Sequence, residues 1–268
     1  MDSFSHDGVV FHFRDRGAGV PLVFQHGLGA DGQQTFDILE GLGGARLLTL
    51  DTRAHGRTKP IGPIAKISLR QSSEDLAALL DRLSIDVAVV GGISMGAAIA
   101  QCFVSRYPAK VAGLILSRPA WLDRPAPPNL RLYGVIADLI RRYGPRQGLV
   151  EFLQTPQYRS LTKYPSTAQS LVDQFREARA EEAVARLERI PTDTPIRNRR
   201  EWRAVEVPAL VLACERDPIH PYEYATELAA AIPNVTLCEL TPKDVSREDH
   251  AADTRRAIAN FLDAMQAR

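Results

Sequence analysis

The sequence predicts an α/β protein with a mostly parallel, twisted sheet flanked by helices and a helical cap inserted after the sixth strand. Three observations support this fold class. Short apolar runs alternate with helical patterns toward both ends of the 268-residue chain, which is typical of a parallel sheet covered on both faces. Residues 123–205 contain no convincing strand. A Gly-x-Ser-x-Gly sequence stands between an apolar run and a helical segment.

The first expected strand, Val9–Arg16, alternates apolar and polar residues before a turn at Gly17–Gly19, as an early antiparallel pair would. The later runs are short, apolar and rich in β-branched residues, which favours buried parallel strands. They are Pro21–Gln25, Arg46–Leu50, Val87–Gly91, Val111–Leu116, Ala209–Ala213 and Val235–Leu240.

Helices are expected where apolar residues recur with a period near 3.6. The helix that follows the Gly-x-Ser-x-Gly sequence should end before Pro108, because the residue before proline disfavours helical geometry. The expected core helices are Gln33–Leu42, Leu69–Leu83, Met95–Tyr107, Tyr222–Ile232 and Ala251–Met265.

The middle of the chain is predicted to form the cap. It opens with Pro125–Pro128 and continues with helical stretches at Leu130–Tyr143, Arg146–Leu153 and Ser166–Arg189. A segment of this length is too long for a loop in a compact domain. We therefore expect a core of residues 1–122 and 206–268 and a cap of residues 123–205, whose many arginines mostly form solvated helix faces.

Composition excludes several classes of partner. The formal net charge of +1 gives no reason to expect nucleic acid or an anionic membrane. No apolar run approaches the length of a membrane span, and the N-terminal residues do not resemble a signal peptide. The three cysteines, Cys102, Cys214 and Cys238, are too few for a disulfide framework. We expect a cytoplasmic protein whose partner is a small-molecule substrate.

The sequence Gly92–Gly96, Gly-Ile-Ser-Met-Gly, has the pattern of a nucleophile elbow. In such a turn the two glycines permit close backbone approach, and Ser94 is held out at the end of the strand. The alternative interpretation is an ordinary strand-to-helix turn, since glycine and serine are common in both.

A serine hydroxyl is a poor nucleophile without a base that is itself oriented by a carboxylate. Asp217 follows the Ala209–Ala213 strand, and His250 follows the last strand. Because the carboxyl ends of parallel strands share one edge of the sheet, both should lie on the side where Ser94 is exposed. We predict Ser94, Asp217 and His250 as nucleophile, acid and base.

Other residues compete for these roles. His220 is expected to brace its loop or line the pocket, and His26 and His55 to be held by backbone hydrogen bonds after their strands. Glu215 and Asp123 are alternative acids. Taken alone, Asp217 could cap a turn before Pro218, and His250 could be a surface residue at a helix start.

Acyl transfer also needs donors for the developing oxyanion. We predict the backbone N–H groups of Met95, directly after the nucleophile, and of Leu28 in the glycine-rich His26–Gly29 loop. No histidine or cysteine pair has metal-ligand spacing, and no phosphate-binding glycine loop is present. We therefore expect no metal and no cofactor.

Together these segments resemble the α/β-hydrolase-fold superfamily, in particular its capped serine hydrolases. The matching segments are His26–Gly29, Asp51–Thr58, Gly92–Gly96, Asp217-Pro218 and His250. The resemblance implies the triad and oxyanion roles given above, and it makes the Asp51–Thr58 turn mainly architectural.

The sequence departs from the family pattern in two places. Ala54 and Thr58 replace the usual glycine and serine of the architectural turn. Asp249, where the family often has glycine, precedes His250, and Phe261-Leu262 follow earlier than usual. Related dehalogenases and epoxide hydrolases use aspartate at the elbow, whereas Ser94 indicates attack on an acyl carbon.

These observations predict a cofactor-independent serine hydrolase of small carboxylic esters or lactones. A carbon–carbon bond hydrolase of β-diketone-like substrates and a ligand-binding receptor on a hydrolase scaffold are the alternatives. The cap is expected to select the substrate, with Trp121, Tyr133, Tyr158 and His220 as candidate lining residues. Core packing is the more common fate of such aromatic residues.

Overall fold

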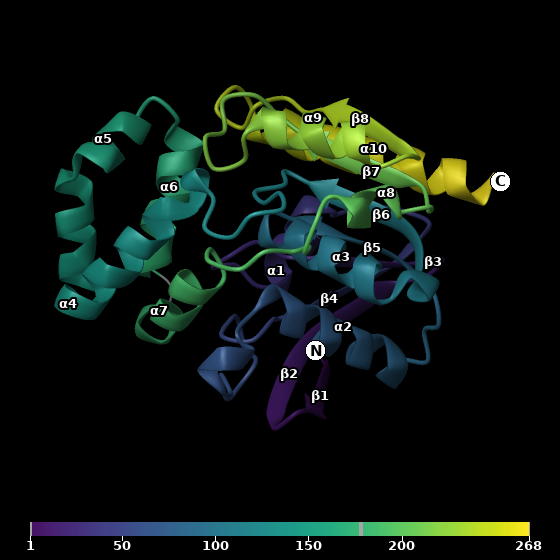
Figure 1. The fold of residues 1–268 in the computed structure, drawn as a ribbon, viewed down its shortest axis with the longest axis horizontal. Coiled ribbons are helices and arrows are strands. Elements are labelled where there is room, and N and C mark those ends of the chain that lie inside the picture. Colours follow the sequence, from purple (N-terminus) through teal and green to yellow (C-terminus); the bar gives the residue numbers. More distant parts are fainter. Residues whose placement is uncertain (1, 177–178, 268) are drawn as a thin grey trace.

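The structure, a computed structural model, describes residues 2–176 and 179–267 and contains one eight-stranded sheet (Figure 1). The strands are β1 (Asp2–His6), β2 (Val9–Gly17), β3 (Val20–Gln25), β4 (Ala45–Leu50), β5 (Ala88–Ile93), β6 (Val111–Ser117), β7 (Ala209–Ala213) and β8 (Val235–Glu239). Their order across the sheet is β1-β2-β4-β3-β5-β6-β7-β8. The pairs β1–β2 and β2–β4 are antiparallel, and all other neighbours are parallel.

Strand β5 lies inside the sheet, paired with β3 on one side and β6 on the other. All six of its residues are buried, which explains its continuous run of small and β-branched side chains. The carboxyl ends of β3, β5, β6, β7 and β8 lie at the same edge of the sheet because these strands are parallel. The loops that leave this edge form the site.

Helices cover both faces of the sheet. Along the chain the core helices are α1 (Gly32–Ile38), α2 (Leu69–Arg82), α3 (Met95–Arg106), α8 (Arg200–Arg203), α9 (Tyr222–Ala231) and α10 (Arg247–Gln266). Residues such as Leu76, Phe103 and Leu228 place α2, α3 and α9 in one apolar cluster. Ile258 and Leu262 of α10 pack in a second cluster with residues around α1. Three short 3₁₀ helices span Ile64–Lys66, Pro108–Lys110 and Pro128–Leu130.

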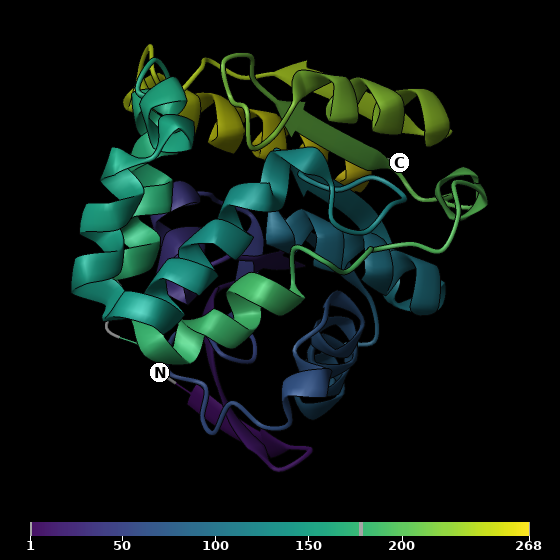
Figure 2. The ribbon, with the colours of Figure 1, turned by 60° about the vertical axis from the view of Figure 1, so that its left-hand side comes forward.

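Four helices follow β6 and stand together beside the core: α4 (Arg131–Gln154), α5 (Pro156–Leu161), α6 (Pro165–Arg176) and α7 (Ala180–Arg189). They are the teal and green helices that cluster on one side in Figures 1 and 2. Gly144, with φ of 72°, and Pro145 divide α4 by a kink, so its two halves match the two predicted helices. The single helix predicted over Ser166–Arg189 is instead two helices, α6 and α7.

Two further elements differ from the sequence prediction, and the second of them bears on the site. Strand β1 was not among the expected strands, although it pairs with β2 along its whole length. Helix α10 begins at Arg247 rather than Ala251, because the Ser246 side chain caps it by accepting the Asp249 N–H at 3.1 Å. His250 therefore lies in the first turn of a helix.

The Asp51–Thr58 turn is held by buried polar contacts. The Asp51 carboxylate accepts the backbone N–H groups of Gly32 at 2.8 Å and Arg57 at 2.9 Å. The Thr58 hydroxyl donates to the Asp51 carbonyl oxygen at 2.6 Å. These contacts fit the architectural role that the resemblance implies.

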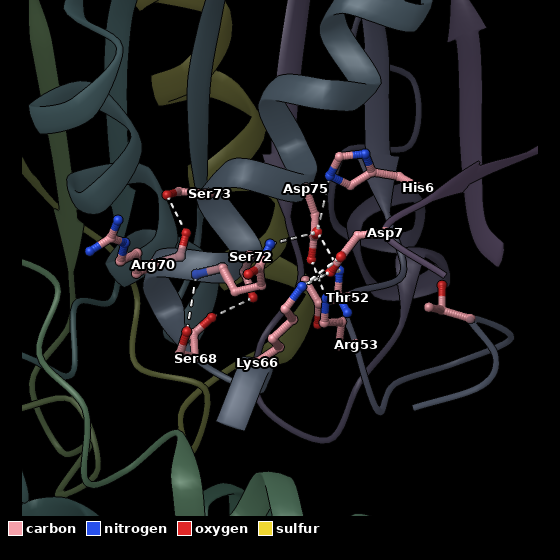
Figure 3. Close-up of polar contacts among 12 residues, drawn as sticks. His6, Asp7, Thr52, Arg53, Lys66, Ser68, Arg70, Ser72, Ser73 and Asp75 are labelled. Carbon is pink, nitrogen blue, oxygen red and sulfur yellow. Dashed lines mark hydrogen bonds and ion pairs between the residues drawn. The ribbon is translucent and has the colours of Figure 1, made fainter. Parts of the chain in front are cut away.

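Arg53, in the same turn, joins three parts of the core (Figure 3). Its guanidinium donates to both carboxylate oxygens of Asp75 on α2, at 2.7 and 2.8 Å, and to Asp7 at 2.9 Å. Lys66 donates to the same Asp7 carboxylate at 2.5 Å. The side chains of Arg53 and Asp75 are each 1% exposed, so each charge depends on the other for compensation.

Two cap arginines bind this turn as well. Arg179 donates to the carbonyl oxygens of Gly56 at 2.9 Å and Thr58 at 3.1 Å, and the buried Arg186 donates to that of Ala54. These two side chains differ from the prediction of mostly solvated arginines, because they attach the cap to the core. Among the described residues, no helix combines the length and apolar character needed to cross a membrane.

Candidate active site

Ser94 occupies a strained turn between β5 and α3. Its φ of 56° and ψ of −109° lie in a region that non-glycine residues rarely adopt. The flanking glycines make the turn possible: a Cβ on Gly92 would approach the backbone of Gly96 to 2.5 Å, and one on Gly96 would collide with the carbonyl oxygen of Gln25. The predicted elbow geometry is therefore present.

The Ser94 hydroxyl is hydrogen-bonded to His220. The Oγ of Ser94 lies 2.8 Å from Nε2 of His220, and Nδ1 of His220 lies 2.9 Å from Oδ2 of Asp217. A turn after β7 brings the side chains of Asp217 and His220 together. In this turn the backbone N–H of His220 donates to the backbone carbonyl oxygen of Asp217 at 3.0 Å. Serine, imidazole and carboxylate thus form a continuous chain, which is the arrangement that activates a serine nucleophile.

His250, the predicted base, does not make this contact. Its Nδ1 lies 2.8 Å from the carbonyl oxygen of Thr241, so Nδ1–H is the donor there. The first turn of α10 fixes its backbone, and the imidazole lines a neighbouring cleft. The structure therefore differs from the sequence prediction, in which His250 reaches Ser94 and His220 only braces the loop.

Arg118, the first residue after β6, completes the group. It donates to Oδ2 of Asp217 through Nε at 2.9 Å and through Nη2, and Nη2 also lies 3.0 Å from Nδ1 of His220. On the other carboxylate oxygen, Oδ1, Asp217 accepts the hydroxyl of Thr167 from α6 at 3.4 Å. Sequence reasoning did not identify Arg118; its place at the carboxyl end of a central strand was the available signal.

Burial and charge set the protonation states of this group. Burial alone would raise the pKa of Asp217, but the charges of Arg118 and His220 hold it well below its usual range. Burial lowers the pKa of His220 to about 4, with Arg118 acting in the same direction and Asp217 opposing. The imidazole is therefore neutral near pH 7 and able to accept a proton, while the carboxylate is ionised.

Of the two predicted oxyanion donors, Met95 directly follows Ser94, and Leu28 belongs to a loop that passes close to Ser94 at Gly27. Met95 is the first residue of α3, where helix N–H groups have no partner within the helix. A Cβ placed on Gly27, directly before Leu28, would lie 3.7 Å from Cβ of Ser94. The side chain of Gln174 on α6 donates to the Leu28 carbonyl oxygen at 3.3 Å, which ties this loop to the cap.

The predicted cap residues are mostly packed rather than exposed. Trp121 and Tyr133 are buried in an apolar cluster with Leu28 and Met95. Burial raises the pKa of Tyr133 to about 12, with the charge of Asp217 contributing. Tyr158 is half-buried, with its ring centroid 5.3 Å from that of Phe152. These aromatic side chains belong to, or pack against, the apolar cluster that contains Leu28 and Met95, and their contact with substrate stays a prediction.

A cleft of about 790 Å³ is lined by Ile93, the residue before Ser94, whereas Ser94, His220 and Asp217 are not among the described residues that line it. Ile93 and Ser117, at the ends of β5 and β6, form its floor, and the Ser94 N–H donates to the Ser117 carbonyl oxygen at 3.0 Å. Residues of α1, α6 and the start of α10 form its walls. This volume is in the range of small-molecule sites.

The sequence was also compared with those of known protein families and of individual proteins. A family model described as the alpha/beta hydrolase fold matches residues 20–243. The AB hydrolase superfamily protein YisY of Bacillus subtilis is 26% identical over 237 residues, which is 85% of each chain.

Solved structures agree with this match in fold. The enol-lactonase of Burkholderia xenovorans superposes with a TM-score of 0.77 at 24% identity, covering 97% of this chain and 99% of its own. A thermophilic esterase of Thermogutta terrifontis superposes with a TM-score of 0.74 at 24% identity, covering 98% and 97%.

Proposed function

The chain belongs to the alpha/beta hydrolase fold family, and we propose that it is a serine hydrolase that cleaves small carboxylic esters or lactones. The observation that carries this proposal is the hydrogen-bonded chain from Ser94 through His220 to Asp217, with distances of 2.8 and 2.9 Å. His220 takes the role of base in place of His250. The relatives named as enol-lactonase and esterase act on the same class of bond.

In the first half of the reaction, Ser94 Oγ attacks the carbonyl carbon while His220 Nε2 accepts the hydroxyl proton. Asp217 stabilises the resulting imidazolium by accepting its Nδ1–H. The N–H groups of Leu28 and Met95 donate to the oxyanion. When the carbonyl re-forms, the alcohol leaves with the proton from His220, and an acyl group remains on Ser94.

In the second half, His220 Nε2 removes a proton from water, whose oxygen attacks the acyl carbon. The tetrahedral intermediate collapses with return of the proton to Ser94, and the carboxylic acid is released. With a lactone, the hydroxyl formed in the first half remains part of the acyl chain, and the product released in the second half is a hydroxy acid. No cofactor enters either half.

The test combines labelling with turnover. An alkyl fluorophosphonate probe should modify Ser94, identified by mass spectrometry, and Ser94→Ala should lower the hydrolysis of short p-nitrophenyl esters and small lactones about 10³-fold or more. Ser105→Ala, which changes an exposed serine on α3, is the matched control and should retain activity. Equal turnover by Ser94→Ala and the unmodified protein would exclude the mechanism.

A further inference from the structure

The cleft lined by Ile93 and Ser117 has positively charged groups along one wall. Lys243 lies in the loop between β8 and α10, Arg247 is the first residue of α10, and His250 follows in the same helix turn. Figures 1 and 2 both show this yellow segment beside α6, and the two are joined by the Ser166 N–H, which donates to Asp244 at 2.7 Å. The wall is thus held in place by a contact between cap and core.

Lys243 is an unusual cation because it is partly buried. Within residues 2–176 and 179–267, its ammonium makes no hydrogen bond or ion pair with another side chain, and neither does the guanidinium of Arg247. Burial lowers the pKa of Lys243 to about 7, with Arg118 acting in the same direction and Asp217 opposing. A desolvated cation without a partner is costly, so an anion in the cleft would stabilise it.

The acidic residues that line the cleft already accept hydrogen bonds from other groups. Asp31 accepts the Gln33 N–H at 2.7 Å as the cap of α1, and Asp37 accepts the Gln33 side-chain amide at 2.6 Å. Asp173, on the exposed face of α6, accepts from Gln169 at 2.6 Å. Asp244, the neighbour of Lys243 in the chain, accepts the Ser166 N–H through Oδ1, and its buried Oδ2 has no hydrogen-bond partner. Among the described residues, none of these carboxylates forms an ion pair with Lys243 or Arg247.

We propose that the cleft binds a carboxylate of the substrate at Lys243, with Arg247 as a second contact, so that the enzyme prefers esters or lactones whose acyl part carries a further carboxylate. This inference rests on the proposed function of Ser94. Ammonium and guanidinium groups bind carboxylates through charge-assisted hydrogen bonds. Ile93, which directly precedes Ser94, and Ser117, whose carbonyl oxygen accepts the Ser94 N–H, both line this cleft, so the proposal places the carboxylate of one small molecule at Lys243 and its carbonyl at the nucleophile.

The experiment measures protection of Ser94 from the fluorophosphonate probe, which needs no turnover. Glutarate and glutaramide have the same length and differ in charge. In the unmodified enzyme, glutarate should halve the labelling rate at a concentration about tenfold lower than glutaramide. Lys243→Met should raise the required glutarate concentration about tenfold, and Lys243→Arg should keep most of the protection.

Lys163→Met is the matched control, because it removes the same charge from an exposed cap residue that does not line the cleft. It should leave protection by glutarate unchanged. Equal protection by glutarate and glutaramide in the unmodified enzyme, or full protection by glutarate in Lys243→Met, would overturn the carboxylate site. Absence of Ser94 labelling without any competitor would instead refute the serine mechanism on which the inference rests.

Discussion

Nη2 of Arg118 lies 3.0 Å from Nδ1 of His220. Both groups also contact Oδ2 of Asp217, so arginine and imidazole share one carboxylate oxygen. An arginine N–H can only donate. Proton acceptance at Nε2 requires a hydrogen on Nδ1, which must then be directed at Asp217. Arg118 therefore neutralises part of the charge that would stabilise the imidazolium, and it keeps the base unprotonated at low pH.

Replacement of Arg118 should move the acid limb of the pH profile. In Arg118→Met the pKa of His220, about 4 with Arg118 present, should rise by about 1 or more, because a neighbouring positive charge is lost. Since the neutral imidazole is the active form, kcat/KM should then decline at a higher pH than in the unmodified enzyme. The measurement is kcat/KM for a short ester between pH 4 and 9.

Arg118→Lys is the conservative control and should shift the profile less. Labelling of Ser94 by the fluorophosphonate probe verifies that each variant keeps its folded site. A profile of Arg118→Met that coincides with that of the unmodified enzyme would mean that Arg118 has only a structural role.

Substitution of His220 and of His250 should have clearly different effects on kcat. His220→Gln removes the imidazole that contacts Ser94, so kcat should fall about 10²–10⁴-fold, the usual contribution of a general base. His250→Gln leaves the Ser94–His220–Asp217 chain intact, and its kcat should stay within about tenfold of the unmodified value. The measurement is steady-state kcat of both variants at pH 7. A larger loss of kcat in His250→Gln than in His220→Gln would identify His250 as the base.

Gln174 on α6 should affect the oxyanion loop. Gln174→Leu removes the donor that reaches the Leu28 carbonyl oxygen at 3.3 Å, so the loop is held less firmly and kcat should fall about tenfold, because small misplacements at a reacting centre are costly. Gln147→Leu, at an exposed position on α4, is the comparison. Unchanged kcat in Gln174→Leu would show that the loop keeps its position without the cap.

The buried ion pair between Arg53 and Asp75 should contribute more to the free energy of unfolding than an exposed ion pair does. In Arg53→Met the Asp75 carboxylate stays buried, and its remaining polar partners among the described residues are His6 at 3.8 Å and the Gln71 amide at 3.2 Å. The free energy of unfolding should therefore fall by about 3–5 kcal/mol. Lys110→Met breaks the more exposed pair with Asp81 and should cost at most about 1 kcal/mol. Urea unfolding measures both, and similar losses would contradict this explanation.

The sequence was most informative where the required geometry is local. Gly92, Ser94 and Gly96 specify the elbow within five residues, because the close approach at the turn admits no other side chains. The alternation of apolar runs and helices was equally readable, because each element has its own periodicity. These features do not depend on which distant segments meet.

The identity of the proposed base and of its partners, in contrast, depends on contacts between segments that are far apart in the sequence. Asp217 and His220 are three residues apart, and only the turn after β7 shows that the Asp217 carboxylate meets His220 while the imidazole meets Ser94. His250 follows the last strand in chain order, but capping by Ser246 begins α10 early and turns this side chain to the Thr241 carbonyl oxygen. Arg118 carried no motif, and its role arises from contacts across about a hundred residues of chain.

Besides the Ser166 N–H that donates to Asp244, two side chains of helix α6 donate to the core: Thr167 to the Asp217 carboxylate and Gln174 to the Leu28 carbonyl oxygen. A chimaera whose cap came from another enzyme would lose both of these side-chain hydrogen bonds together with the original substrate selectivity. Grafted caps that retain threonine and glutamine at these two positions should keep a higher kcat than grafted caps chosen only for the residues that line the cleft.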